Sequence, residues 1–297
     1  MLPVRTVDEQ EHIVATGTWQ APEGAVGPPE FLPELDVPAP DRQRRWTVLL
    51  RWLLLIPQFV VVWVLSVLAV PAAIVGWFGA LVLGRLPDPI ERYLAGFVAY
   101  DTRVRASAML LVDDYPPFAW DGGDHPVRVE LRPGELNRLA VFFRLILMIP
   151  AAIVQSLLTG GWYVAAFVIW LIVLILGRMP EPLYGATAAV LRYGMRFGAY
   201  VLMLTSAYPK RLFGDEGLPP IAAARSATRP LMLSTGAKAL VVLFLVLGLA
   251  SGISNAFRSD GDGYDYDARG RSTTATASPA HTTAATETNP LTAGSRP

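Results

Sequence analysis

Three long apolar runs constrain the fold of this chain more than any other feature of its sequence. They cover residues 52–84, 145–177 and 239–257, and none of them contains a charged side chain. About 20 consecutive apolar residues are enough for a helix to cross a bilayer. Charged residues make up only 17% of the chain, against roughly a quarter in soluble domains. The sequence therefore predicts an integral membrane protein and argues against an ordinary cytosolic enzyme.

The charge balance and the absence of cysteine narrow the function classes further. The chain carries 25 basic and 25 acidic residues, so no bulk attraction to nucleic acid is expected. It has no cysteine and three scattered histidines, which excludes disulfides and gives no metal-ligand spacing. We expect no cofactor and no metal site.

Each of the first two runs is long enough to suggest two membrane passes. We expect the first pair to be joined near Pro71, and the second pair, 139–158 and 162–176, to be joined at Gly160-Gly161. Residues 162–176 would form a helix of only about 22 Å, so a re-entrant hairpin that never fully crosses is the alternative. In both cases, the two ends of each pair emerge on the same side.

Two further segments have helical patterns but carry charges. Residues 90–112 are expected to form an amphipathic helix lying in the membrane plane, because several charged side chains would be costly at the bilayer centre. Its apolar face is predicted to contain Ile90, Leu94, Phe97, Val104, Ala108 and Leu111. The counterpart, 183–207, is more apolar; we favour the in-plane arrangement, with a membrane-spanning helix as the alternative.

The positions of the arginines predict the orientation. Basic residues are frequent in 85–138 and 178–237 and absent from the short turns near Pro71 and Gly160. By the positive-inside rule, these segments and the N-terminus are expected in the cytoplasm. A fifth segment, about 238–257, would then cross the cell membrane and leave a Ser/Thr/Ala/Pro-rich tail, 258–297, disordered outside.

The two halves of the chain are a tandem repeat with an offset of 93 residues. The offset joins residues of the specific types Arg, Gly, Pro and Trp, which coincidence does not explain. The matched pairs include Arg45 with Arg138, Arg51 with Arg144, Trp77 with Trp170, Gly84-Arg85 with Gly177-Arg178, and Tyr115-Pro116 with Tyr208-Pro209. Because each unit returns to its starting side, we expect parallel copies related by an axis along the membrane normal.

This repeat resembles a known family. Arg followed by Pro six residues later, then Gly-Arg-x-Pro and a closing Tyr-Pro, is similar to the membrane family catalogued as domain of unknown function 4389. The resemblance covers about half the chain and implies an integral membrane protein, often with two copies, but no activity. A His that often follows the Ile-Pro in the family is replaced here by Gln58 and Ala151.

The predicted organisation is an all-α membrane protein with about five membrane segments. Each repeat is a transmembrane helical hairpin plus an in-plane amphipathic helix, and one C-terminal helix follows. The segments are a flexible arm 1–41, repeat 1 at 42–118, a linker 119–134, repeat 2 at 135–212, a linker 213–237, the helix 238–257 and the tail 258–297.

Four arginines form the candidate binding site. Arg51 and Arg144 lie near the start of their helices, and Arg85 and Arg178 end the apolar runs. If the hairpins are correct, all four guanidinium groups converge on one leaflet, where they could bind anionic lipid headgroups. The favoured alternative is that they snorkel or pair internally with Asp88 and Glu181.

Three other motifs have mainly structural interpretations. Gly84-x-x-Pro87 and its copy are predicted to stop helices. Asp113-Asp114 offers paired carboxylates for acid–base chemistry, but a turn is favoured. Residues 127–132 alternate apolar and charged and predict a short strand, whose nearest counterpart is 34–38, shifted by one residue.

The favoured function is a non-enzymatic membrane protein that organises anionic lipid or a membrane protein partner. The alternative is a transporter or channel subunit with broken helices at the interface of the repeats. Against that alternative, the apolar segments lack Asp, Glu and His. An enzyme acting on lipid lacks a recognisable nucleophile–base pair.

Overall fold

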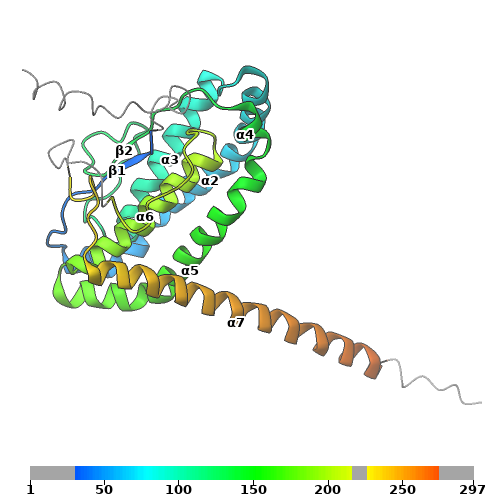
Figure 1. Ribbon diagram of the computed structural model, residues 1–297. Helices are drawn as coiled ribbons and strands as arrows, with labels where there is room; N and C mark the ends of the chain where they lie inside the picture. Colours follow the sequence, from blue (N-terminus) through cyan, green and yellow to red (C-terminus); the bar gives the residue numbers. More distant parts are fainter. Residues whose placement is uncertain (1–30, 216–225, 274–297) are drawn as a thin grey trace, which may run out of the picture. The chain divides into compact units, whose positions relative to one another are not determined.

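The computed structural model describes residues 31–215 and 226–273, with side chains up to Asn255. Most of the flexible arm, part of the second linker and the end of the tail therefore lie outside the described residues. Figure 1 shows a mostly helical chain with one small sheet. The elements are β1 (Glu34–Asp36), α2 (Arg45–Leu83), α3 (Asp88–Ala108), β2 (Arg128–Glu130), α4 (Arg138–Phe142), α5 (Arg144–Leu176), α6 (Glu181–Val201) and α7 (Thr235–Thr273).

The helix α2 is continuous, so the predicted turn near Pro71 is wrong. It runs for 39 residues through both Pro57 and Pro71, a length of about 58 Å if straight. A proline inside a helix removes one hydrogen bond but keeps a helical φ. Apolar helices tolerate it because neighbouring groups re-satisfy the freed backbone. The presence of Pro71 alone was therefore not enough to predict that a helix ends there.

The helix α5 is also continuous, and its paired glycines serve a helix crossing instead of a turn. A Cβ on Gly161 would lie 1.7 Å from the backbone oxygen of Phe244 in α7. A Cβ on Gly248 would lie 2.0 Å from the backbone oxygen of Leu157 in α5. Glycine at these positions lets the two backbones touch, as small residues do where membrane helices cross.

The predicted helix stops are confirmed. Gly84 and Gly177 cap α2 and α5 in the left-handed conformation, with φ of 74° and 67°. Their amide groups donate back to Ala80 and Val173. The prolines that follow stand at the N-caps of α3 and α6. Each long helix therefore stops and reverses at the same place in its repeat.

The helical hairpin of the first repeat is formed by α2 and α3, not by two halves of α2. Arg51 near the start of α2 pairs with Asp113, which lies beyond the end of α3. The Tyr93 hydroxyl of α3 donates to the Leu65 carbonyl in the middle of α2, at 2.8 Å. The two helices therefore run antiparallel, and α5 with α6 repeats the arrangement.

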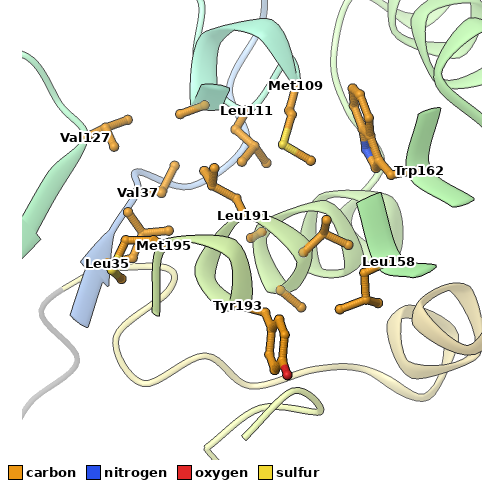
Figure 2. Close-up of a cluster of buried hydrophobic side chains, with 14 of the residues drawn as sticks. Leu35, Val37, Met109, Leu111, Val127, Leu158, Trp162, Leu191, Tyr193 and Met195 are labelled. Carbon is orange, nitrogen blue, oxygen red and sulfur yellow. The ribbon is translucent and has the colours of Figure 1, made fainter. Parts of the chain in front are cut away.

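The helix α6 lies in the protein core. Fifteen of its residues are buried. Leu191 and Met195 lie among a cluster that includes Leu35 of β1 and Trp162 of α5, and Tyr193 is buried on the other side of the helix (Figure 2). The apolar surface that predicted an interfacial helix packs largely against protein. Of the apolar face predicted for 90–112, Leu94 and Val104 of α3 and Leu111, which lies beyond the end of α3, are buried, while the other three are partly exposed.

The predicted strand at 127–132 is confirmed, together with its shifted counterpart. β1 and β2 form an antiparallel two-stranded sheet in which Leu35 lies opposite Val129. These two residues are 94 positions apart, one more than the repeat offset. The sheet therefore joins the segments that precede the two repeats, and it adds a small β element to the predicted all-α fold.

The contacts between the repeats are reciprocal. The indole of Trp77 donates to the carbonyl of Val141 at 3.1 Å, and the indole of Trp170 donates to that of Val48 at 2.9 Å. Donors and acceptors are both 93 residues apart. A second reciprocal pair is formed by the backbone. The Gln43 amide donates to the Gly177 carbonyl, and the Leu136 amide donates to the Gly84 carbonyl, both at 2.8 Å. A pseudo-two-fold axis therefore relates the two repeats.

Three described helices are long and apolar enough to cross a membrane: α2, α5 and residues Thr235–Asn255 of α7. The predicted number of five counted α2 and α5 twice. The helix α7 continues to Thr273, beyond the predicted end at 257, and no proline stands between Pro230 and Pro279 to stop it. The compact unit ends at Leu249, and the remainder of α7 belongs to a second unit.

Candidate functional site

Arg51 and Arg144, the first two residues of the predicted lipid site, are buried and bonded within their own repeats. Arg51 donates to the Asp113 carboxylate at 2.8 Å, and its side chain is only 4% exposed. Arg144 donates to the Thr205 carbonyl at 2.7 Å and lies over the Tyr200 ring at 4.2 Å. Neither guanidinium is open to a lipid headgroup. Both are bonded internally, but to Asp113 and Thr205 and not to the predicted partners Asp88 and Glu181.

Arg85 and Arg178 are exposed, and each follows the end of the long helix that begins near Arg51 or Arg144. Arg85 follows the C-terminal end of α2, whereas Arg51 lies in its second turn. Because α2 is one helix of 39 residues, the two guanidinium groups stand near its opposite ends. The predicted convergence of all four on one leaflet therefore requires both ends of each long helix to lie on the same side of the bilayer.

The exposed arginines instead gather at two junctions between the repeats. At the first junction, Arg45 donates to the Ile175 carbonyl at 3.3 Å, near Arg178. At the second junction the equivalent residues meet, since Arg138 lies beside Gly84, which precedes Arg85. Each junction therefore combines an arginine before one long helix with an arginine after the other.

An open groove lies along the first junction. Its volume is about 1420 Å³, and it runs between the start of α2 and the loop from α5 to α6. Three exposed arginines and two acidic residues line it: Arg42, Arg45, Arg178, Asp41 and Glu181. Beside it, Leu176 and Trp46 are exposed at 56% and 76%. Positive charge next to bare apolar surface is the arrangement of a membrane interface.

A second set of arginines lies in the core and was missed by sequence reasoning. Arg192 of α6 donates to the Asp215 carboxylate at 2.5 Å, and its side chain is 2% exposed. Arg196, one turn later, donates to the carbonyls of Pro33 and Lys210. Burial lowers the pKa of Arg196 to about 10. The signal available in the sequence was the presence of two arginines inside a mostly apolar helix. Their contacts are structural and do not form a catalytic site.

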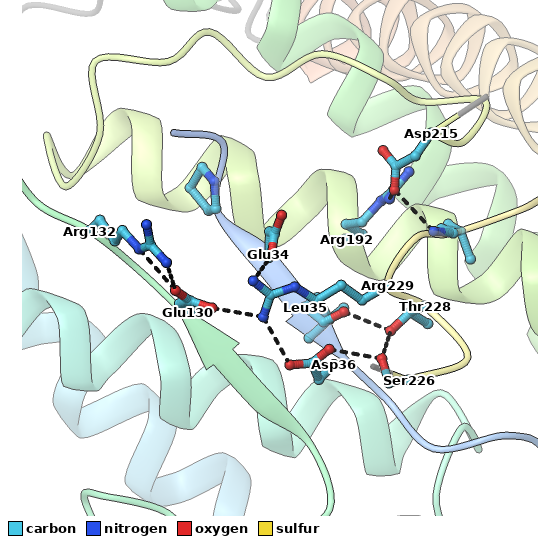
Figure 3. Close-up of polar contacts among 12 residues, drawn as sticks. Glu34, Leu35, Asp36, Glu130, Arg132, Arg192, Asp215, Ser226, Thr228 and Arg229 are labelled. Carbon is cyan, nitrogen blue, oxygen red and sulfur yellow. Dashed lines mark hydrogen bonds and ion pairs between the residues drawn. The ribbon is translucent and has the colours of Figure 1, made fainter. Parts of the chain in front are cut away.

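Arg229 forms the most connected ion-pair network in the described part of the chain (Figure 3). Its guanidinium contacts Glu34 and Asp36 of β1 and Glu130 of β2, the last at 2.7 Å. Glu34 and Glu130 lie directly opposite each other in the sheet, where like charges repel. Arg229 neutralises that repulsion and fastens the segment after 225 to the sheet.

The motifs with alternative catalytic interpretations have structural contacts. Asp113 accepts hydrogen bonds from Arg51, from the Thr47 hydroxyl and from the Arg44 amide, so the favoured turn interpretation fits it. His125 is buried, and its Nδ1 accepts from the Val127 amide at 3.2 Å. Across residues 31–215 and 226–255, no three His, Asp or Glu side chains are grouped to hold a metal ion.

Comparison with known proteins agrees with the repeat and adds no activity. No curated protein and no solved structure matches the chain. The model of one family matches twice, at residues 45–119 and 138–212, close to the repeat boundaries predicted from the 93-residue offset. The two matches cover half of the sequence, one copy on each α-helical hairpin. The chain therefore belongs to the family described as a domain of unknown function (DUF4389), of which it holds two tandem copies.

Proposed function

We propose that this protein is a non-enzymatic, integral protein of the cell membrane that holds anionic phospholipid at the first junction. Membrane insertion is supported by the surface of the long helices, because only 17% of the most apolar window of α2 and 28% of that of α5 are buried within the protein. Exposed side chains such as Trp63, Phe78 and Phe167 form an apolar surface that lipid would cover.

The observation that carries the lipid proposal is the groove at the first junction. Its arginines outnumber its acidic residues, and they stand beside exposed apolar side chains of α2 and α5. A guanidinium group binds phosphate through paired N–H donors. A phosphate at this groove would keep its acyl chains against the bare helix surface.

The test is native mass spectrometry of the protein extracted gently from its own membrane. The Arg45→Gln/Arg178→Gln variant is expected to lose bound anionic phospholipid at least fivefold. Arg128→Gln is the matched control, since it removes one exposed charge from β2, away from both junctions. Equal retention of anionic lipid by wild type and the double variant would reject the site.

The reach of the linkers supports one topology over the others. Leu136 bonds to Gly84 and is six residues from Glu130 of β2, a span of at most about 21 Å. Gln43 bonds to Gly177 and is seven residues from Asp36 of β1, at most about 25 Å. Both distances fall short of the roughly 30 Å hydrocarbon core. Both ends of α2 and of α5 therefore belong on the side of the sheet.

We infer that α2 and α5 enter and leave the bilayer from the same side without crossing it, which requires each helix to curve within the apolar layer while its helical hydrogen bonding stays unbroken. In this arrangement α7 alone crosses the bilayer. This arrangement keeps the repeats parallel, with their two-fold axis along the membrane normal. The arginine-rich segments are assigned to the cytoplasm and the C-terminal tail to the outside.

The chain has no native cysteine, so single cysteines report the topology directly. Cysteines replacing Asp41 and Asp88, which are both exposed and flank α2, are expected to react with an impermeant reagent from the same side. Labelling from opposite sides would mean that α2 crosses fully.

The alternative function, a transporter or channel subunit, predicted broken helices between the repeats. The long helices α2 and α5 are unbroken, so this alternative has less support. Solute or ion flux in liposomes containing the purified protein would favour it over lipid binding.

A further inference from the structure

A cavity lies between the two repeats, apart from the junction groove. Its volume is about 350 Å³, within the usual range for small-molecule sites. The lining residues from α3 and α6 come in pairs related by the 93-residue offset, such as Phe97 with Val190 and Met109 with Leu202. The cavity therefore straddles the pseudo-two-fold axis.

The cavity exists where the two repeats differ. Asp101 and Arg105 of α3 correspond to Gly194 and Gly198 of α6, and all four line the cavity. A Cβ on Gly198 would meet no atom within 4 Å, although most of α6 is buried. Gly198 thus leaves open the space that an arginine equivalent to Arg105 would fill, whereas a Cβ on Gly194 would lie 3.0 Å from Gln155 Nε2.

The cavity wall is apolar on one part and charged on another. Trp52 and Tyr163, which line it, are 44% and 59% exposed on the apolar surfaces of α2 and α5, so it opens toward lipid. Arg105 pairs with Asp101 at 2.7 Å through Nε, and the two side chains are 53% and 19% exposed. Within the described residues, no hydrogen bond or ion pair from the outer nitrogens of Arg105 is present.

We propose that this cavity binds a zwitterionic phospholipid with a phosphoethanolamine headgroup, one acyl chain entering the cavity. The outer N–H groups of Arg105 would donate to the phosphate, and the Asp101 carboxylate would accept from the ammonium. Arg105 and Asp101 carry no net charge together, so a headgroup of no net charge matches them better than an anionic one. A choline headgroup has no N–H to donate to Asp101.

The proposal rests on membrane insertion but not on the anionic site at the first junction. The experiment is native mass spectrometry of the full chain exchanged into mixed micelles of phosphatidylethanolamine, phosphatidylcholine and phosphatidylglycerol. Wild type is expected to retain one phosphatidylethanolamine. Gly198→Leu, which fills the cavity, is expected to lower this occupancy at least tenfold. Gly252→Leu is the matched control, because Gly252 is exposed on α7 with open space around it.

Two polar variants test the headgroup contacts without filling the cavity. Asp101→Asn is expected to abolish the preference for ethanolamine over choline, and Arg105→Gln to lower the affinity for both by about fivefold. A second arm with lysophosphatidylethanolamine distinguishes a single-chain ligand from one chain of a diacyl lipid.

The outcomes separate this proposal from the proposed function. Arg45→Gln/Arg178→Gln should reduce phosphatidylglycerol and leave phosphatidylethanolamine bound. If wild type retains no ethanolamine lipid, or if Gly198→Leu and Arg105→Gln retain it as wild type does, the cavity proposal is wrong. Loss of phosphatidylglycerol binding alone would bear only on the first junction.

Discussion

Trp77 and Trp170 make the same hydrogen bond in opposite directions across the two repeats. Each indole N–H reaches a carbonyl near the N-terminal end of the other repeat's long-helix segment, at 3.1 and 2.9 Å. A tryptophan in an apolar segment can serve as packing alone, but here its one polar group is also used. The interface between the repeats is thus fastened once at each end.

Replacing either tryptophan by phenylalanine should destabilise the protein, and the two variants should do so similarly. Each change removes one hydrogen bond and leaves a carbonyl without that donor, a loss of about 1–2 kcal/mol. Thermal unfolding in detergent, followed by circular dichroism, measures the effect. Trp63→Phe is the control, because Trp63 is 66% exposed. A large effect in only one of the two variants would contradict the reciprocal arrangement.

The crossing of α5 and α7 should be sensitive to a single methyl group. Gly161→Ala places a Cβ 1.7 Å from the Phe244 oxygen, so the helices must separate, at a cost of about 1–3 kcal/mol. Gly160→Ala is the neighbouring control, since its Cβ would lie at an ordinary 3.8 Å from Gly248. The thermal midpoints of the two variants should differ clearly. If they are equal, the close crossing does not form.

Arg229→Gln should weaken the sheet. Glu34 and Glu130 would then face each other without the cation between them, and we expect a loss of about 1–2 kcal/mol. Proteolysis near residue 226 should become faster than in Arg128→Gln, which removes an exposed charge from the same strand pair. If Arg229→Gln resists proteolysis as well as the wild type does, the ion-pair network around Arg229 does not hold this segment on the sheet.

The stability of the protein should fall in mild acid because of His125. Burial lowers the pKa of its imidazole, so the folded state binds a proton less readily than the unfolded chain. As the pH falls below about 6.5, the ordinary histidine value, the unfolded state gains protons first and stability is lost. Thermal midpoints between pH 7.5 and 5 measure this. His125→Gln should flatten the decline, and an identical slope in the variant would assign the effect to other groups.

The parts of the fold that repeat in the sequence were the most predictable. The offset of 93 residues located both copies and the glycine caps, because each depends on residue type at a fixed position. The short strands were predicted from alternation of apolar and charged residues, with a counterpart shifted by one residue from that offset. The helical hairpin was mispredicted because Pro71 and Gly160-Gly161 were interpreted as local breaks. Their true surroundings, the antiparallel α3 and the touching α7, are tertiary contacts that local pattern does not contain.

The candidate site was predictable only in part, for a related reason. Sequence reasoning identified Arg51 as unusual in an apolar helix, but its partner Asp113 is 62 residues away. Arg85 and Arg178 are exposed, as residues that bind a lipid headgroup must be. The grouping of Arg45 with Arg178 depends on how the two repeats dock, which neither repeat shows alone.

Joining both copies in one chain has an evolutionary consequence. In a homodimer, any substitution near the symmetry axis is present in both copies, so the new residue must pack against its own equivalent. Here Asp101 and Arg105 can face Gly194 and Gly198, because each copy mutates separately. A chain that holds both copies can thus make its shared surface asymmetric, with a pocket on the axis whose two walls differ, whereas a homodimer would have two identical walls.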